Sequence, residues 1–369
     1  MHDPYKALYI HVPFCKQRCR YCDFATQAAP AGSPLFDEYT ARMLMDIRKA
    51  SRDGMLGSIE TVYIGGGTPS YLGHARLTEI LYMLSLSMRL TTDVECSMEA
   101  NPESLTDRMV KDIFALGVNR LSIGVQSFDD EVLGKLGRIH DAAAARRAVE
   151  TAHERFDNVS VDLMCGVPGQ TRESFRSSVR QAIDLDVSHV SVYPLTIEPG
   201  TPFYGLVAKG RMDDIDPDAQ ARQMEDAESL LREAGFERYE VASYAKPGFA
   251  CRHNKAYWTG IPYLGLGPSV VTMTQNAERR MRKQDGQVID DLDVKQMRVE
   301  DIMLGMRMSE GVSDGKVAWA AEVAPELPSV LRRLEENGLV MRGPGRWMPT
   351  ERGWICGNDL YEPIFELAP

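Results

Sequence analysis

Apolar residues along the first 200 positions form short runs, and each run is followed by a stretch in which apolar residues recur every third or fourth position. A short apolar run is typical of a strand, and the longer period is typical of an amphipathic helix. Repeated strand–helix units predict a parallel sheet with right-handed crossovers. The predicted strands cover residues 7–14, 59–64, 94–100, 118–125, 159–163 and 189–194. The predicted helices between them cover residues 35–52, 104–116, 130–136, 142–155 and 173–185.

The pattern becomes less regular after residue 200. Asp216 and Pro217 favour the N-cap and first helical position, and they predict a helix that ends near residue 234. A strand is predicted over residues 239–244, whereas residues 251–258 show neither a helical nor a strand period. The polar residues 284–295 indicate a connection.

The C-terminal part of the chain predicts a second, smaller unit. Helices over 299–308 and 327–337, a hairpin over 339–348 and a helix after Thr350 together indicate a winged-helix-like α+β arrangement. We therefore predict two domains. Residues 1–285 would form an α/β barrel, including an appended segment at about 236–270, and residues 286–369 would form a C-terminal accessory domain.

Composition narrows the class of protein. The 369 residues are 44% hydrophobic and carry a formal net charge of −11, which argues against a general nucleic-acid binder because phosphate contacts need a basic surface. No apolar run approaches the roughly 18 residues that span a bilayer, and the chain enters its first predicted strand without a signal peptide. Seven cysteines include three that are too close together for ordinary pairing. We expect a reducing, cytoplasmic setting in which clustered thiols bind metal.

Three cysteines follow the first predicted strand directly. Cys15, Cys19 and Cys22 have the spacing C-x3-C-x2-C, and three thiolates bind three corners of an iron–sulfur cluster while the fourth iron stays open. Buried apolar cysteines and an incomplete zinc knuckle are the alternatives. No second C-x2-C or histidine pair follows to complete a zinc site, so we expect a cluster.

Polar residues or glycines also stand at the ends of the other predicted strands. The second strand ends in Gly65-Gly66-Gly67-Thr68-Pro69, where glycines allow the backbone to approach a ligand and free amides can bind an anion. Loops at the carboxyl ends of barrel strands form the active face of such folds. We therefore expect one shared site along this rim. Its candidate residues are Cys15, Gly66, Glu99, Gln126, Asp162 and Thr196.

A dense polar and aromatic segment, Cys251-Arg252-His253-Asn254-Lys255-Ala256-Tyr257-Trp258, stands apart from this rim in the sequence. Its aromatic residues could anchor a loop on the barrel, or its histidine could be an axial ligand in a flat haem site. The residues alone favour the loop anchor.

In these motifs the chain resembles the radical S-adenosylmethionine superfamily, and within it the oxygen-independent coproporphyrinogen III oxidase-like group. It most resembles the HemW-type haem chaperones. The resemblance implies a partial (βα)6 TIM-like barrel, with Cys15, Cys19 and Cys22 as ligands of a [4Fe–4S] cluster. It also implies that S-adenosylmethionine is bound by Tyr9, Gly66, Gly67, Thr68, Glu99, Gln126, Arg138 and Asp162.

Three features separate the chaperones from the oxidases. The oxidases have a further cysteine where this chain has Phe24, and they have a long N-terminal extension where the first strand here begins within ten residues. The chaperones have an H-N-x-x-Y-W motif associated with haem binding, and here this motif is formed by His253, Asn254, Tyr257 and Trp258. His253 is the natural axial ligand, with Cys251 as the alternative.

The resemblance therefore implies a haem chaperone that binds the cluster, S-adenosylmethionine and haem. Its implied partners are an electron donor and haem-accepting proteins, membrane-associated ones among them, and no nucleic acid. Cleavage of S-adenosylmethionine is a further implied activity, whereas oxidation of coproporphyrinogen is not expected. The alternatives are a coproporphyrinogen III oxidase and a haem carrier whose cluster is only structural.

Overall fold

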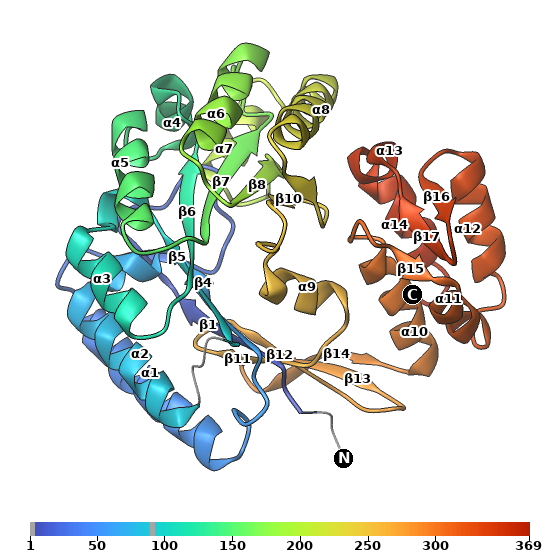
Figure 1. Ribbon diagram of the computed structural model, residues 1–369, viewed down its shortest axis with the longest axis horizontal. Coiled ribbons are helices and arrows are strands. Elements are labelled where there is room, and N and C mark those ends of the chain that lie inside the picture. Colours follow the sequence, from blue (N-terminus) through green and yellow to red (C-terminus); the bar gives the residue numbers. More distant parts are fainter. Residues whose placement is uncertain (1–3, 89–92) are drawn as a thin grey trace.

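The computed structural model describes residues 4–88 and 93–369. Six strands lie side by side in chain order and each runs parallel to its neighbour, which confirms the predicted parallel sheet (Figure 1). They are β1 (Ala7–Val12), β4 (Thr61–Gly66), β5 (Glu95–Ala100), β6 (Arg120–Gln126), β7 (Val159–Cys165) and β8 (His189–Pro194). Because the strands are parallel, their carboxyl ends meet at one rim of an open, partial barrel.

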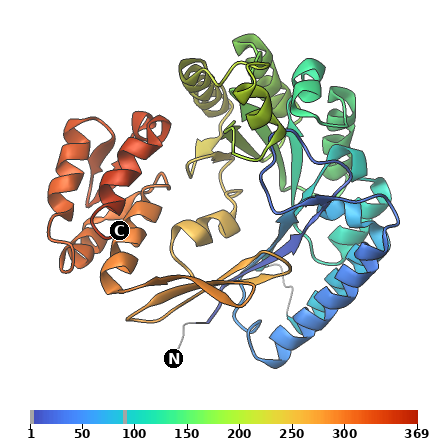
Figure 2. The ribbon, with the colours of Figure 1, turned by 180° about the vertical axis from the view of Figure 1, so that it is seen from behind.

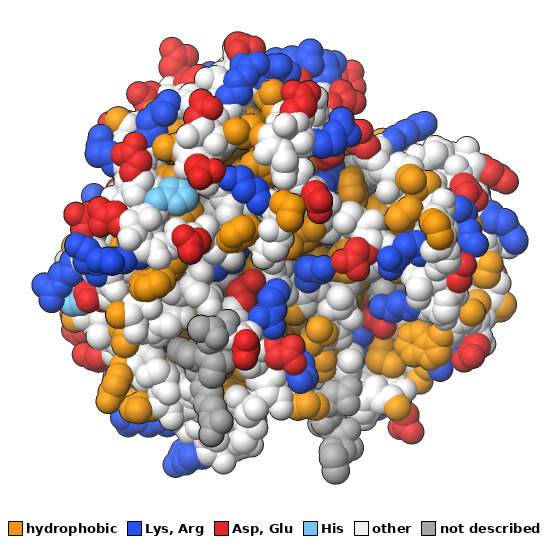
Figure 3. Space-filling view, viewed as in Figure 1, with side chains coloured by type: hydrophobic (Ala, Val, Ile, Leu, Met, Phe, Trp, Pro, Cys, Tyr) orange, Lys and Arg blue, Asp and Glu red, His pale blue; other side chains and the backbone are white. Residues whose placement is uncertain are grey.

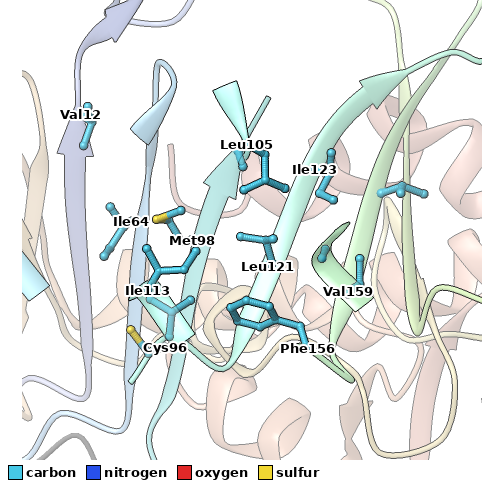
Figure 4. Packing of buried hydrophobic residues seen from close by; sticks show 14 of the residues in the cluster. Val12, Ile64, Cys96, Met98, Leu105, Ile113, Leu121, Ile123, Phe156 and Val159 are labelled. Carbon is cyan, nitrogen blue, oxygen red and sulfur yellow. The ribbon is translucent and has the colours of Figure 1, made fainter. Parts of the chain in front are cut away.

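Helices cover the outer face of this sheet (Figure 1). They are α1 (Pro34–Arg52), α2 (His74–Ser87), α3 (Asp107–Ala115), α4 (Asp130–Leu136), α5 (Ala142–His153) and α6 (Arg172–Asp184), of which α2 was not predicted. Met98 and Leu121 from the strands pack with Ile113 of α3 and with Phe156, which follows α5 (Figure 4). Burial of these apolar side chains holds each helix against the sheet.

The sheet continues beyond the parallel strands at both edges. Next to β8 lie β10 (Ser243–Ala245) and β9 (Glu237–Arg238), both antiparallel to their neighbours, where one strand over 239–244 was predicted. On the other edge β11 (Tyr263–Leu266) runs parallel to β1. A ribbon of β12 (Val271–Gln275), β13 (Arg280–Gln284) and β14 (Gln287–Leu292) completes the sheet.

The prediction of a polar connection over 284–295 is wrong, because β14 lies within it and occupies half of its positions. Ion pairs along the ribbon explain the polar sequence. Arg282 pairs with Asp290 at 2.6 Å, and Arg279 pairs with Asp291 at 2.7 Å. Opposite charges on neighbouring strands stabilise a ribbon without an apolar face.

Residues 252–258 form a helix, α9 (Arg252–Trp258), where no regular element was predicted. Figures 1 and 2 both place α9 between the open sheet and the C-terminal part. The two helices that precede it are α7 (Pro202–Ala208) and α8 (Pro217–Glu233), and the second has the predicted Asp216 cap. A helix of seven residues that contacts protein on several sides has no amphipathic period, which explains the failed prediction.

The C-terminal part is an α+β unit, as predicted, with its own apolar core. Its helices are α10 (Val294–Gly305), α11 (Asp314–Ala321), α12 (Leu327–Glu336), α13 (Glu351–Ile355) and α14 (Gly357–Phe365), of which α11 was not predicted. Its sheet consists of β15 (Val312–Ser313), β16 (Val340–Gly343) and β17 (Arg346–Pro349). Buried Leu331 and Trp347 belong to the core that joins these elements.

The surface is mixed in character. On the face shown in Figure 3, basic and acidic side chains alternate with apolar ones. Among the described residues, no helix is both long enough and apolar enough to cross a membrane.

Candidate functional site

A cavity of about 380 Å³ opens at the carboxyl ends of the parallel strands. The loop after β1 forms one wall. In this loop β2 (Phe14–Cys15) pairs with β3 (Gln27–Ala28), so the intervening residues form a closed turn that presents the cysteines to the cavity. This geometry places residues from several strands around one cavity. The polar residues and glycines at successive strand ends predicted this arrangement.

Most of the predicted cofactor residues line this cavity. These residues are Cys15, Cys19, Cys22, Gly66, Gly67, Thr68, Glu99, Gln126, Arg138, Asp162 and Thr196. Tyr9 is not among the lining residues, because its hydroxyl lies 3.1 Å from His11 Nδ1 and its ring stacks with Tyr63. Phe24 does line the cavity, and its side chain is 67% exposed.

Two polar side chains approach the cysteine sulfurs. Thr68 Oγ1 donates to Cys15 Sγ at 3.6 Å, and Arg138 Nη1 donates to Cys19 Sγ at 3.5 Å. Burial raises the pKa of the Cys15 thiol, and the Thr68 hydrogen bond opposes this shift. Donors aimed at sulfur stabilise thiolates, so this wall fits a group held by three thiolates.

The type of metal group that the three cysteines could bind depends on how the donor side chains are arranged. Within residues 4–88 and 93–369, no three His, Cys, Asp or Glu side chains are placed to hold a single metal ion. A cubane cluster instead takes one thiolate on each of several irons. Cys15, Cys19 and Cys22 line one cavity and could each supply one thiolate to such a group.

Glu99 lies at the base of the glycine segment. Its Oε2 accepts from Gly66 N at 3.0 Å and its Oε1 accepts from the Tyr63 hydroxyl at 2.9 Å. Burial, and then the charge of Asp162, raise the pKa of Glu99 to about 7. Asp162 itself accepts from Ser122 Oγ at 3.3 Å, and burial raises its pKa too. The two carboxyl groups therefore share a site in which ionisation of one disfavours ionisation of the other.

Unusual backbone geometry places two predicted residues, Gln126 and Gly66, at the cavity. Gln126 has a φ of 65°, and the pairing of β6 with β7 shifts register between Ile123 and Gln126. Such bulges redirect side chains beside functional sites. Gly66 has a φ of 112°, and a Cβ there would lie 2.5 Å from the His11 ring, so only glycine fits.

The second predicted site, the H-N-x-x-Y-W motif, forms most of α9 and lies apart from the cavity. His253 is 1% exposed. Its Nδ1 lies 2.9 Å from Thr61 Oγ1, its Nε2 lies 3.3 Å from the Tyr257 hydroxyl, and its ring stacks on Tyr63. Burial lowers the pKa of His253 to about 3, so the ring is neutral near pH 7. Both ring nitrogens have protein partners in this conformation.

The start of α9 is held by Glu95, the first residue of β5. Its carboxylate accepts from Arg252 N and from His253 N, each at 2.9 Å. Cys251 Sγ lies 3.4 Å from Glu95 Oε1 and is fully buried, and burial raises the pKa of this thiol to about 12. An acidic side chain at a helix N-terminus satisfies free amides and favours the helix dipole.

The rest of the motif connects α9 to other elements. Asn254 Nδ2 donates to the Tyr239 hydroxyl at 3.4 Å, and Trp258 Nε1 donates to Glu240 Oε2 at 3.1 Å. The guanidinium of Arg307, which follows α10, lies 5.0 Å from the Trp258 ring centre. The motif therefore joins the barrel to the C-terminal unit.

Comparisons with known proteins agree with this architecture. Residues 9–182 match the Radical SAM superfamily and residues 292–356 match the HemN C-terminal domain. Heme chaperone HemW of Bacillus subtilis is 33% identical over an alignment of 379 positions, which covers 96% of this chain and 98% of that relative. Heme chaperone HemW of Escherichia coli is 41% identical over 268 residues, covering 72% of this chain and 69% of that relative.

The chain belongs to the HemW family of the radical SAM superfamily. Among solved structures, coproporphyrinogen III oxidase (HemN) from Escherichia coli, described as a radical SAM enzyme, has a TM-score of 0.80. It is 20% identical, and the match covers 98% of this chain and 90% of that chain. At this identity the likeness shows a common fold and not a common reaction.

Several cavity residues of this HemW-family chain were not predicted. Asn101 follows β5 directly, and Met164 and Tyr193 lie near the ends of β7 and β8. For Met164 and Tyr193, the position near the end of a predicted strand was a signal that could have identified them. Asn101 had a weaker signal, because its importance depends on contacts with residues 33 and 37 positions away.

Proposed function

We propose that this chain is a haem chaperone, which holds a [4Fe–4S] cluster and S-adenosylmethionine in the cavity and delivers haem to acceptor proteins. The observation that carries the proposal is the match over 96% of the chain to a relative named Heme chaperone HemW. The cavity supports it, because the three cysteines and the glycine segment face one space.

In this proposal Cys15, Cys19 and Cys22 hold three irons of the cluster. When bound, the cluster supplies an open iron for S-adenosylmethionine and an electron that can cleave it. Thr68 and Arg138 hold the thiolates in place through their hydrogen bonds to sulfur. An electron donor would be a further partner.

The cavity residues proposed to bind S-adenosylmethionine contribute complementary groups. The glycine segment presents backbone groups beside Glu99, while Gln126, Arg138 and Asp162 line the same space. Arg138 carries a positive charge suited to a carboxylate, and acidic side chains suit amino and hydroxyl groups. Tyr9 would act only indirectly, through Tyr63, since it does not line the cavity.

For haem we propose the α9 motif, with His253 as the axial ligand. Iron needs a free ring nitrogen, and both nitrogens of His253 are hydrogen-bonded in the enclosed conformation. Haem binding therefore requires His253 to lose either its bond to Thr61 or its bond to Tyr257 within α9, and it requires α9 to move so that the buried ring becomes accessible. Cys251, the alternative ligand, is fully buried behind the same helix start, so it needs the same movement.

The test is anaerobic reconstitution of the cluster, followed by separate assays with haem and with coproporphyrinogen III, each with S-adenosylmethionine and a reductant. We expect a haem Soret band, transfer of haem to an apo-haemoprotein, and no porphyrinogen conversion. His253→Ala should abolish the ligated haem spectrum, whereas His153→Ala, an exposed histidine on α5, should not.

Two outcomes would contradict the proposal. Sustained conversion of coproporphyrinogen III to protoporphyrinogen would identify an oxidase that has Phe24 in place of the further cysteine. Haem transfer that persists fully in a refolded protein without a cluster would identify a haem carrier whose cluster is structural.

A further inference from the structure

Asn101 lies between the two side chains that donate to cysteine sulfur. It follows β5 and precedes the short helix η2 (Pro102–Ser104), and its amide faces the cavity wall. Asn101 Oδ1 accepts from Arg138 Nη2 at 2.7 Å, and Asn101 Nδ2 donates to Thr68 Oγ1 at 2.9 Å. One side chain thus contacts both sulfur donors.

Chemistry fixes the direction of every hydrogen bond in this chain of contacts. A guanidinium can only donate, so the oxygen of the Asn101 amide must face Arg138. The amide nitrogen, which can only donate, then faces Thr68, and the Thr68 oxygen must accept. The single hydroxyl proton of Thr68 is left for Cys15 Sγ, 3.6 Å away.

The Arg138 side of the contact is equally constrained. Its Nη2 is shared between Asn101 Oδ1 and the Gly124 carbonyl, each at 2.7 Å. A planar guanidinium held at one nitrogen by two acceptors has its other nitrogen fixed as well. Arg138 Nη1 is thereby directed at Cys19 Sγ, 3.5 Å away.

We propose that Asn101 is a positioning residue that orients Thr68 and Arg138 as hydrogen-bond donors to two cluster cysteines and so raises the reduction potential of the cluster. This inference rests on the proposed function, because it requires that these cysteines hold the cluster. Donors to sulfur stabilise negative charge, and the reduced cluster carries one more electron than the oxidised cluster. Loss of Asn101 should therefore make the cluster harder to reduce.

The experiment is a potentiometric titration of the reconstituted full chain, followed by EPR, for Asn101→Leu and Thr68→Val. Each lost sulfur donor should change the one-electron reduction equilibrium by about tenfold, which is a fall of about 59 mV. Asn101→Leu should lower the potential at least as far as Thr68→Val. The double variant should fall short of the sum, because Asn101 acts on Cys15 through Thr68.

Two controls separate this role from general packing. Thr68→Ser keeps the hydroxyl and should restore the wild-type potential. Ser104→Ala removes a hydroxyl that donates to the backbone carbonyl of Asn101 at 3.1 Å. This hydroxyl does not bond the side-chain amide of Asn101, so the variant should leave the potential unchanged.

The outcomes distinguish the inference from the proposed function. A wild-type chain that assembles no cluster would refute the proposed function. A fully loaded Asn101→Leu protein with an unchanged potential would overturn the inference alone. If Asn101→Leu does not fold, the comparison of Thr68→Val with Thr68→Ser still decides, since equal potentials in these two would also overturn it.

Discussion

The two ends of the barrel differ in how far their polar groups are already satisfied. At the carboxyl ends of the strands, cysteines, glycines and carboxyl groups surround an open cavity of about 380 Å³. At the amino ends, Thr61 and Glu95 begin β4 and β5 and are already bonded to α9. One end is preformed for a ligand, and the other is closed by its own helix.

This difference separates two kinds of site. A preformed cavity can bind its cofactor without losing protein contacts, so it retains most of the binding energy. In the proposed function, the enclosed α9 motif must break hydrogen bonds before His253 can ligate iron. Under that proposal the affinity for haem would be reduced by the cost of opening, and release of haem would be assisted when α9 returns. A haem chaperone of the proposed kind, which must deliver its cargo, would benefit from such a site.

The largest expected effect comes from removing one cysteine at the open end of the barrel. Cys19→Ala removes one cluster ligand, so iron content after reconstitution should fall from about four per chain to near zero. The free energy of unfolding of the cluster-free protein should change little, because Cys19 belongs to none of the buried apolar clusters. Cys356→Ala, in the C-terminal unit, is the matched control and should keep full iron content. Normal iron content in Cys19→Ala would refute the cluster assignment.

Breaking the closed end should instead affect stability. Glu95→Ala removes the carboxylate that accepts from the amides of Arg252 and His253 at the start of α9. Loss of a hydrogen bond to a buried carboxylate costs about 1.5–3 kcal/mol for each bond, measurable by urea denaturation. Glu60→Ala, which breaks an exposed pair with Lys6, should cost under about 1 kcal/mol. Equal losses in the two variants would contradict a specific role for Glu95.

A smaller expected effect tests the electrostatics of the open end of the barrel, where Glu99 lies. Because the pKa of Glu99 is raised to about 7 in the folded chain, the folded state favours its protonated form. This contribution is fully present below the unfolded pKa of about 4.5 and is lost as pH rises through 7. The free energy of unfolding should therefore fall by about 1–3 kcal/mol between pH 5 and pH 8 on account of this group.

Glu99→Gln cannot ionise, so this part of the pH dependence should disappear from the variant. Unfolding curves at several pH values would measure it, with Glu60→Gln as a variant that keeps the wild-type slope. An unchanged slope in Glu99→Gln would show that Glu99 ionises normally in the folded protein.

The smallest expected effect concerns the hydrogen bond within α9 that occupies His253 Nε2. Tyr257→Phe removes the hydroxyl bonded to His253 Nε2 and keeps the ring contacts with His253 and Tyr263. One neutral hydrogen bond contributes about 1 kcal/mol, so haem affinity should rise up to about fivefold by spectrophotometric titration. Weaker haem binding in Tyr257→Phe would mean that the hydroxyl assists haem rather than competing with it.

The open end was predictable from the sequence because its signals follow the strand period. Each parallel strand ends at the same rim, so a cysteine, glycine or carboxyl residue at successive strand ends predicts a common site. Gln126 and Asp162 were placed correctly in this way, although they are 36 positions apart. Tyr9, which only the family resemblance implied, does not line the cavity, because its side chain contacts His11 and Tyr63.

The closed end was not predictable, for physical reasons. Residues of α9 contact β4 through His253, β11 through Tyr257 and the C-terminal unit through Trp258, so the helix has no single apolar stripe. The ribbon β12–β14 was missed because ion pairs such as Arg282–Asp290, rather than an apolar face, stabilise it. Burial of His253 also depends on Thr61, which lies 192 positions away.

Hydrogen–deuterium exchange of α9 with and without haem tests the central claim most directly. In the haem-free protein the amides of Arg252 and His253 should be protected, because they donate to Glu95. Haem should increase exchange across 252–258, while S-adenosylmethionine should change exchange only around the cavity loop and the glycine segment. If haem binds through His253 and α9 stays fully protected, the enclosed motif does not open, and the account of the closed end is wrong.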